Sequence, residues 1–255
     1  MSDWIVVFID LEAEARSGLR IGGPSPRVDT DMPVHRDHRG QPLLPGSSLK
    51  GVLRSTAERV LRARGGPGEH GACDVLTEPC LGRLGEESEV GDDELERRCW
   101  CCRVFGGPHC AGRLTVGDLQ AEAASTIVRD GVGIDRDELR AADGVKFDYE
   151  VVVPGSIFTG TLRIDDPEPG DIGMLLGLLE LFEAGVSTLG SGASRGLGQV
   201  RISATGIREL RASTWVPGSE PSRWDDDRVR REREDAGILL RALAERAGRA
   251  QEAGR

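Results

Sequence analysis

The run W-I-V-V-F-I-D-L (Trp4–Leu11) is almost entirely apolar and has the length of one β-strand. Short continuous apolar runs of this kind are typical of central strands that are buried on both faces of a sheet. No basic segment stands ahead of the run, as a secretory leader would require, so it predicts a first strand rather than a signal peptide. The sequence therefore predicts a sheet with this strand at its centre.

A helix is predicted after a long Gly- and Pro-rich loop that spans residues 18–45. Pro45-Gly46 ends the loop, and Ser47 or Ser48 can cap the helix. The apolar residues that follow are spaced so that they form one stripe along a helix: Leu49, Val52, Leu53, Ala57, Val60 and Leu61. The Gly-Gly-Pro-Gly sequence at residues 65–68 ends it.

The remaining chain repeats this pattern of strand and helix. Arg113–Leu119 and Ile157–Ile164 alternate like strands, and residues 171–186 predict a deeply buried helix capped by Asp171. A last strand is predicted at Gln199–Ile202. The order strand, helix, strand, insertion, strand, helix, strand predicts an α+β fold of the ferredoxin-like (RRM-like) type, which hosts many functions and names none.

The composition indicates a soluble globular protein with an aliphatic core, because 38% of the residues are hydrophobic and only 4% are aromatic. The sequence has no apolar run long enough for a membrane span, so we expect a cytoplasmic protein with no membrane partner. The net charge of −10 argues against a freestanding nucleic-acid binder. However, Arg16–Arg64 carries ten basic and four acidic residues, and Asp74–Arg98 carries nine acidic and three basic ones. One basic and one acidic face are therefore predicted, with solubility as the alternative role of the acidic surface.

The start of the first helix carries positive charge where an ordinary helix has acidic residues. Ser47 and Ser48 stand at the cap, and Lys50 and Arg54 follow on one face. Since the helix N-terminus is itself a positive pole, this pattern indicates an anion such as a phosphate. The alternative is an amphipathic helix with a solvated basic face.

A Gly-rich segment, T-L-G-S-G-A-S-R-G-L-G-Q-V (Thr188–Val200), is a second candidate for RNA binding. Its glycines permit close backbone approach to a ligand, and Arg195 can clasp a phosphate or stack on a base. It runs from a helix into a strand, so it is neither a Rossmann nor a P-loop motif. The alternative is a flexible connection. The predicted contacts are Gly190, Gly192, Ser194, Arg195 and Gly196.

Six cysteines lie between residues 73 and 110. In a cytoplasmic protein this pattern favours metal binding over disulfides. The Cys-x-x-Cys spacing of Cys99 and Cys102, with Cys73 and Cys80 upstream, predicts a structural zinc site. Substitutes for any one of the four ligands are Cys110, Cys101 and His70.

The loop R-V-D-T-D-M-P-V-H-R-D-H-R (Arg27–Arg39) mixes acidic and basic residues. Carboxylates in such a setting can hold a divalent metal at a phosphodiester or accept a proton from a ribose 2′-hydroxyl. The acidic candidates are Asp29, Asp31 and Asp37, and they stand among His35, His38 and Arg36. The alternative is a solvated polar loop.

Four blocks, in order, resemble the repeat-associated mysterious protein (RAMP) superfamily, and most closely the Csm/Cmr-type backbone subunits of type III CRISPR effector complexes. The first block is P-V-H-R-D-H-R-G-Q-P-L-L-P-G-S-S-L-K-G-V-L-R (Pro33–Arg54). The second is C-R-V-F-G-G (Cys102–Gly107) with A-G-R-L-T-V-G-D (Ala111–Asp118). The third is F-D-Y-E-V-V-V-P-G-S-I-F-T-G (Phe147–Gly160), and the fourth is the Gly-rich segment.

The resemblance implies a single RAMP domain, residues 1–255, with four parts. Residues 1–68, 113–120 and 156–204 would form a ferredoxin-like palm, and residues 69–112 a zinc-containing finger. Residues 121–155 would form a β-hairpin thumb, and residues 205–255 a helical C-terminal extension. Such subunits bind the CRISPR guide RNA, stack on further copies of themselves and contact other subunits of the complex.

The resemblance also implies a reaction. Asp31, with Asp29 as the alternate, would act on complementary target RNA in a step that depends on Mg²⁺ or Mn²⁺. The 2′-hydroxyl would attack the neighbouring phosphate to give a 2′,3′-cyclic phosphate and a 5′-hydroxyl, and Arg36 would contact RNA. Two other functions remain open: an architectural subunit without nuclease activity, and a stand-alone guide-processing endoribonuclease that uses His35 or His38.

Overall fold

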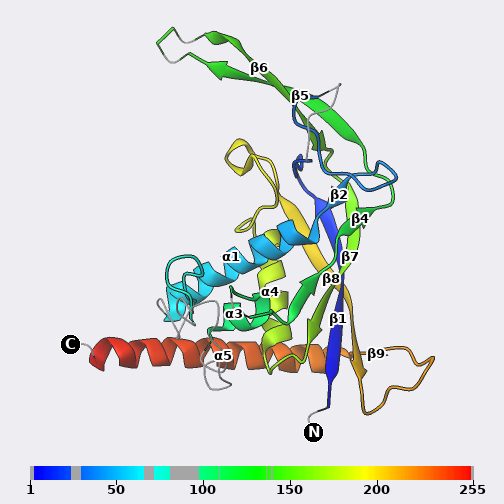
Figure 1. Cartoon of the computed structure of the whole chain (residues 1–255), viewed down its shortest axis with the longest axis vertical. Coiled ribbons are helices and arrows are strands. Elements are labelled where there is room, and N and C mark those ends of the chain that lie inside the picture. The colour runs from blue at the N-terminus through cyan, green and yellow to red at the C-terminus, as the bar shows by residue number, and fades with distance from the viewer. Residues whose placement is uncertain are drawn as a thin grey trace.

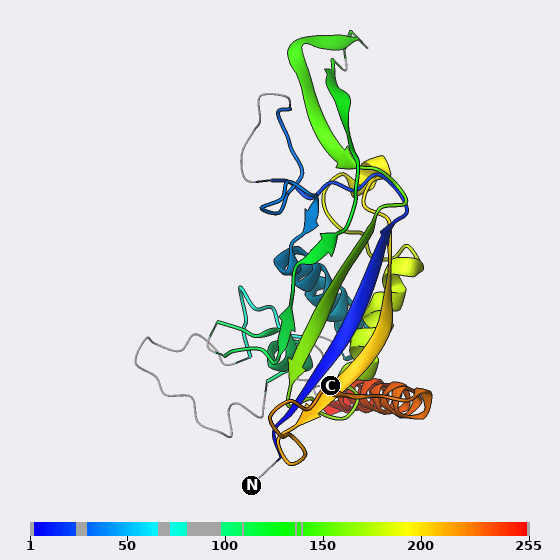
Figure 2. The ribbon, with the colours of Figure 1, turned by 90° about the vertical axis from the view of Figure 1, so that its right-hand side faces the viewer.

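The molecule is built on one antiparallel β-sheet with helices on one of its faces (Figures 1 and 2). This computed structural model describes residues 3–23, 30–65, 72–80, 98–108, 110–135, 137–138 and 140–253. The strands follow the order β2-β4-β7-β1-β8-β9 across the sheet, and β3 also pairs with β7. The predicted mixed fold with an antiparallel sheet is therefore confirmed.

The first strand lies at the centre of the sheet, as predicted. β1 (Ile5–Ala15) pairs along its length with β7 (Ile157–Asp165) on one side and β8 (Val200–Arg211) on the other. The prediction that both of its faces are buried is wrong, because from Val7 onward buried and partly exposed residues alternate. The helices cover only one face (Figure 2), so the open face takes polar residues such as Asp10, which pairs with Arg208.

Two predicted helices pack against the covered face. α1 (Gly46–Gly65) and α4 (Asp171–Glu183) coincide with the two apolar patterns in the sequence. A short helix, α3 (Trp100–Phe105), lies beside them and is buried almost throughout. These helices and the inward side chains of β1 form one hydrophobic core.

Asp171 does not cap α4, because Gly170 occupies the cap position and Asp171 is the first helical residue. Its buried carboxylate instead accepts hydrogen bonds from the Trp100 indole at 2.7 Å and the Glu168 backbone N–H at 2.9 Å. Arg113 also forms an ion pair with this carboxylate, at 2.9 Å. Burial raises the pKa of Asp171 despite the neighbouring Arg113. This carboxylate therefore ties α3 to the start of α4.

The strand predicted at Arg113–Leu119 is two short strands, β3 (Leu114–Val116) and β4 (Leu119–Ala121). The break falls at Gly117-Asp118, where the Asp118 carboxylate accepts a hydrogen bond from the Gly46 N–H at the start of α1. β2 (Leu43–Leu44) pairs with β4 at the edge of the sheet. The break between β3 and β4 therefore places a side chain that binds the start of α1.

The predicted insertion forms a long β-hairpin that projects from one end of the sheet (Figure 1). Its strands are β5 (Thr126–Ile134) and β6 (Ala141–Val152), which pair with each other as a separate two-stranded sheet. Val128, Val132 and Ile134 are exposed along it. The hairpin is therefore a projecting arm, and only its base contacts the loops described below.

The C-terminal part differs from the predicted boundary at residue 205, because β8 continues to Arg211 and is followed by β9 (Ser222–Arg223). α5 (Asp226–Ala253) then packs across α1 and α4. A Cβ added to Gly173 would lie 2.1 Å from the Glu232 carbonyl oxygen, so only glycine permits this contact. None of the helices in the described part of the chain is both long and apolar enough to cross a membrane.

Candidate functional site: a groove and a cysteine cage

A pocket of about 490 Å³ opens where the Gly-rich loop, the base of the hairpin and the loop around Asp31 meet. We call residues 30–40 the Asp31 loop. Four stretches of the chain contribute its walls. The lining residues are Arg20, Met32, Phe147, Tyr149, Ser191, Gly192, Ser194, Arg195 and Leu197. We call this pocket the groove. Its described lining contains two arginines and no carboxylate.

The Gly-rich loop is held in place by backbone contacts and is not a free connection. The Ser191 N–H donates to the Arg20 carbonyl at 2.9 Å, and the Gly198 N–H donates to the Gly18 carbonyl at 2.9 Å. Gly190 has a φ of +82°, and a Cβ on it would lie 2.3 Å from the Arg20 oxygen. Gly190 therefore permits a close backbone approach, but the backbone approached belongs to the chain itself, and the approach to a ligand stays a prediction.

Two guanidinium groups face the groove. Arg195 lies in the short 3₁₀ helix η1 (Ala193–Arg195) and is exposed, and within the described residues its side chain makes no ion pair. The Arg20 guanidinium donates to the Ser191 hydroxyl at 2.6 Å. Sequence reasoning missed Arg20, although its place in a long, basic loop was a signal for it.

Two aromatic rings also line the groove, and we call them the aromatic wall. Phe147 and Tyr149 alternate along β6 and so share one face, with ring centroids 6.1 Å apart. Met32 pairs with Tyr149 as a parallel bridge, and the Glu150 N–H donates to the Met32 carbonyl at 3.0 Å. Sequence reasoning did not assign these rings, although Tyr149 is the only tyrosine of the chain.

Asp31 lies beside this wall, one residue from Met32, and is exposed. It is held by a reciprocal pair of hydrogen bonds: its N–H donates to Asp148 Oδ1 at 2.7 Å, and the Asp148 N–H donates to Asp31 Oδ2 at 3.1 Å. Two carboxylates therefore stand side by side at the edge of β6. The alternate candidate, Asp29, lies outside the described residues.

Arg36 has a structural role and does not line the groove. Its guanidinium pairs with the buried Glu150 carboxylate and also donates to the Gly40 carbonyl at 2.6 Å and the Thr126 hydroxyl at 3.0 Å. Burial would raise the pKa of Glu150, but hydrogen bonds from Thr126, the Val34 N–H and Arg36 lower it below its usual value. Arg36 thus fastens the Asp31 loop to the hairpin.

The basic helix start is also satisfied within the chain. Lys50 Nζ donates to the Leu114 carbonyl at 2.7 Å, and burial with the nearby Arg54 charge lowers the pKa of Lys50. The anion predicted at the helix N-terminus is the Asp118 carboxylate, 2.8 Å from the Gly46 nitrogen. Neither Lys50 nor any other residue of α1, Ser47 and Ser48 included, lines the groove. The structure therefore does not join Lys50 and Arg195 in one cradle.

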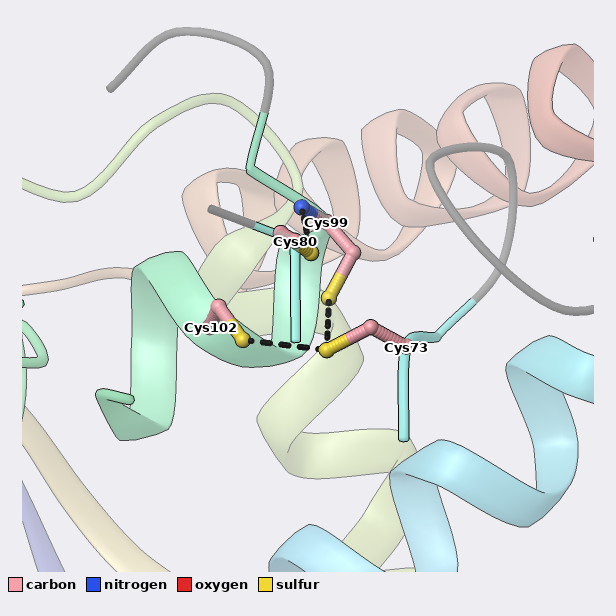
Figure 3. A group of neighbouring side chains, drawn as sticks. All are labelled: Cys73, Cys80, Cys99 and Cys102. Carbon is pink, nitrogen blue, oxygen red and sulfur yellow. Dashed lines mark hydrogen bonds between the residues drawn. The ribbon is translucent and has the colours of Figure 1, made fainter. Parts of the chain in front are cut away.

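The four cysteines chosen from their spacing converge (Figure 3). The sulfurs of Cys73, Cys80, Cys99 and Cys102 all lie within 4.8 Å of one another, with Cys73 and Cys102 at 3.4 Å and Cys73 and Cys99 at 3.8 Å. We call this group the cysteine cage. Four thiolates around zinc, each at about 2.3 Å, stand about 3.8 Å apart, so the cage has the dimensions of a zinc site.

The chemistry of the cage also suits a metal. Hydrogen bonds from Cys102 and Cys80 lower the pKa of the Cys99 thiol, whereas hydrogen bonds with Cys80 and Cys99 raise the pKa of Cys102. Three of the four cysteines are buried, so the cage can hold a cation out of water. A closed set of four sulfurs with no free position is typical of structural zinc.

Two of the substitute ligands, Cys101 and Cys110, are not part of the cage. Burial raises the pKa of the Cys101 thiol. The Cys110 thiol lies nearby, 3.9 Å from the Cys102 carbonyl oxygen. His70 and the acidic stretch at residues 86–96 lie outside the described residues.

The family model for the RAMP superfamily matches residues 12–201, which run from within β1 to the start of β8. The chain therefore belongs to the RAMP superfamily. It is similar to the CRISPR system Cms endoribonuclease Csm3 of Methanocaldococcus jannaschii, with 34% identity over 120 residues. That match covers 46% of this chain and 38% of the relative, so the chain spans well under half of that protein's length.

Proposed function

We propose that this protein is a backbone subunit of a type III CRISPR effector complex that binds guide RNA and cleaves complementary target RNA beside Asp31. The groove carries this proposal, because it combines what an RNA strand needs within one pocket. Arg20 and Arg195 offer charge to phosphates, while Phe147 and Tyr149 offer faces on which bases can stack. The RAMP membership and the similarity to a Csm3 protein support the same function.

The parts of such a subunit can be assigned to the observed elements. The strands β4, β7, β1 and β8 are neighbours in antiparallel order, with α1 and α4 on one face, and this arrangement supports a ferredoxin-like palm. The hairpin of β5 and β6 would be the thumb, and the cysteine cage would hold zinc in the finger. Further copies of the chain and other subunits would complete the complex.

The cleavage step follows from the position of Asp31. Its carboxylate would accept the proton of a ribose 2′-hydroxyl, whose oxygen then attacks the adjacent phosphorus. The 5′-oxygen leaves and takes a proton from solvent, which gives a 2′,3′-cyclic phosphate and a 5′-hydroxyl. The Asp148 N–H orients the Asp31 carboxylate, and Arg195 would hold the phosphate chain.

A divalent cation fits the acidic edge of β6, because Asp31 and Asp148 offer the oxygen ligands that Mg²⁺ or Mn²⁺ prefers. When bound, the cation would stabilise negative charge on the phosphate. Stand-alone guide processing by His35 or His38 has less support, because neither residue lines the groove. An architectural subunit without cleavage is the outcome if Asp31 proves inert.

The test is Asp31→Asn in the assembled complex with guide RNA, complementary target RNA and Mg²⁺. The amide can still accept the Asp148 N–H bond but cannot take a proton, so cleavage should fall about a hundredfold or more while target binding is unchanged. Asp130→Asn is the matched control, because Asp130 lies exposed on the same hairpin. Normal cleavage by Asp31→Asn would refute the catalytic assignment, and a wild-type complex that binds target without cutting it would favour the architectural role.

A further inference from the structure

Three charged residues of α1 are aligned beside the cysteine cage. Arg54, Glu58 and Arg62 follow one another at intervals of four residues, and so lie on one face of the helix. Glu58 contacts both neighbours, at 2.8 Å from Arg54 Nε and 3.5 Å from Arg62. We call this group the α1 ladder.

The ladder contacts the two halves of the cage separately. Arg54 donates to the Gly106 carbonyl at 2.7 Å, and its other terminal nitrogen lies 3.9 Å from the Cys102 sulfur. Arg62 donates to the carbonyl oxygens of Ala72 and Cys73, at 3.2 Å and 2.5 Å. One helix face therefore touches both the segment that carries Cys73 and the segment that carries Cys102.

The charges of the ladder complement those of a loaded cage. Four thiolates around one divalent cation carry a net charge of −2, and this excess is costly where water is scarce. The ladder brings two guanidinium groups and one carboxylate, a net charge of +1, to the edge of the cage. The Arg54 side chain is only 21% exposed, so its attraction to the sulfurs is poorly screened by solvent.

Each of the three side-chain nitrogens of Arg54 already has a partner within the chain. Its Nε pairs with Glu58, one terminal nitrogen with Gly106 and the other with the Cys102 sulfur. A phosphate would have to compete with these partners for the guanidinium group. Arg54 therefore serves partners within the chain itself, and one of them is the Cys102 sulfur of the cage.

We propose that the α1 ladder is the outer shell of the metal site, with Arg54 as the residue that orients Cys102 and offsets the charge of the thiolates. This inference rests on the zinc site proposed above. Outer-shell partners of metal ligands commonly change metal affinity without touching the metal. α1 then links metal occupancy of the finger to the core of the protein, since the opposite side of the helix packs against the sheet through Leu49, Leu53 and Leu61.

The experiment measures zinc affinity of the full-length protein by competition with a chromogenic zinc chelator. Arg54→Gln should weaken zinc binding about 10- to 100-fold. Arg54→Lys keeps the charge but not the planar set of donors, so its zinc affinity should lie between those of Arg54→Gln and the wild type. Arg59→Gln removes an exposed arginine of the same helix and should leave zinc affinity unchanged.

Two further measurements separate this inference from the functions it rests on. If wild-type protein binds no zinc, the metal site itself fails. If wild type binds zinc and Arg54→Gln binds it as tightly as Arg59→Gln does, only the outer-shell role fails. RNA binding by zinc-saturated Arg54→Gln in the assembled complex should equal that of the wild type. A loss of RNA binding with normal zinc affinity would show instead that Arg54 contacts RNA. Circular dichroism at saturating zinc checks that the variants are folded.

Discussion

The groove and the cysteine cage both place arginines beside a potential partner, and they use them in opposite ways. At the cage, Arg54 and Arg62 donate to carbonyl oxygens and a sulfur of the chain. At the groove, Arg195 is exposed and unpaired within the described residues, and Arg20 bonds only a serine hydroxyl among side chains. An arginine is therefore available to RNA only where the fold has left its donors without internal acceptors.

The two regions also differ in how they are built. The cage is buried against α1 and closed by four sulfurs. The groove lies between a loop, a projecting hairpin and the Asp31 loop, and it opens to solvent. A closed, charged cluster of this kind suits a permanent metal, whereas an open groove suits a ligand that must enter and leave.

The largest effect is expected from breaking the cage. Cys99→Ser removes one of the four thiols of the cage. Zinc content should therefore fall from about one per chain to nearly none, and thermal unfolding should occur at a clearly lower temperature. Cys110→Ser is the control, because this thiol lies outside the cage. Metal analysis and calorimetry measure both changes. Full zinc content in Cys99→Ser would mean that another residue completes the site.

A smaller effect is expected from the aromatic wall of the groove. Tyr149→Ala removes a stacking surface, and stacking on one base contributes about 1–3 kcal/mol, so target RNA affinity should fall about 5- to 150-fold. Tyr149→Phe keeps the ring and should bind nearly as well as the wild type. Filter binding with the assembled complex measures this. Equal affinity of the Ala and Phe variants would show that no base stacks on Tyr149.

The smallest effect is expected from replacing one basic side chain, and the result should differ between Arg195 in the groove and Lys50 in α1. Arg195→Gln should weaken RNA binding modestly and reduce the salt dependence of the logarithm of affinity by roughly one unit, as loss of one phosphate contact does. Lys50→Gln removes the same charge, but Lys50 bonds the Leu114 carbonyl. It should therefore lower thermal stability and leave the salt dependence unchanged. The reverse result would place the RNA on α1.

The elements of the fold could be predicted where the pattern is local. The apolar stripe of α1 and the alternation of β7 depend only on neighbouring residues, and both elements form where expected. The burial of β1 on both faces was wrong, because whether a second layer covers a strand depends on the rest of the chain. Asp171 was misjudged for the same reason, since its partner Trp100 is 71 residues away.

The candidate sites divide in the same way. The four cysteines could be chosen from sequence because only a few residue types bind zinc and their spacing is restricted. The wall of Phe147 and Tyr149 could not, because an alternating pair of rings on a hairpin is an ordinary pattern until a loop closes over it. Asp148 was equally hidden, and only its reciprocal bonds with Asp31 identify it.

The sequence by itself determined the main strands and helices, the four cysteines that converge in the cage and the presence of basic residues at the helix start and in the Gly-rich loop. Only the tertiary structure decided which of those basic residues face solvent. The physical reason is that a guanidinium acts through acceptors within about 3 Å. The Gly106 carbonyl that binds Arg54 and the Glu150 carboxylate that binds Arg36 lie 52 and 114 residues away along the chain, so no local pattern can reveal these two acceptors.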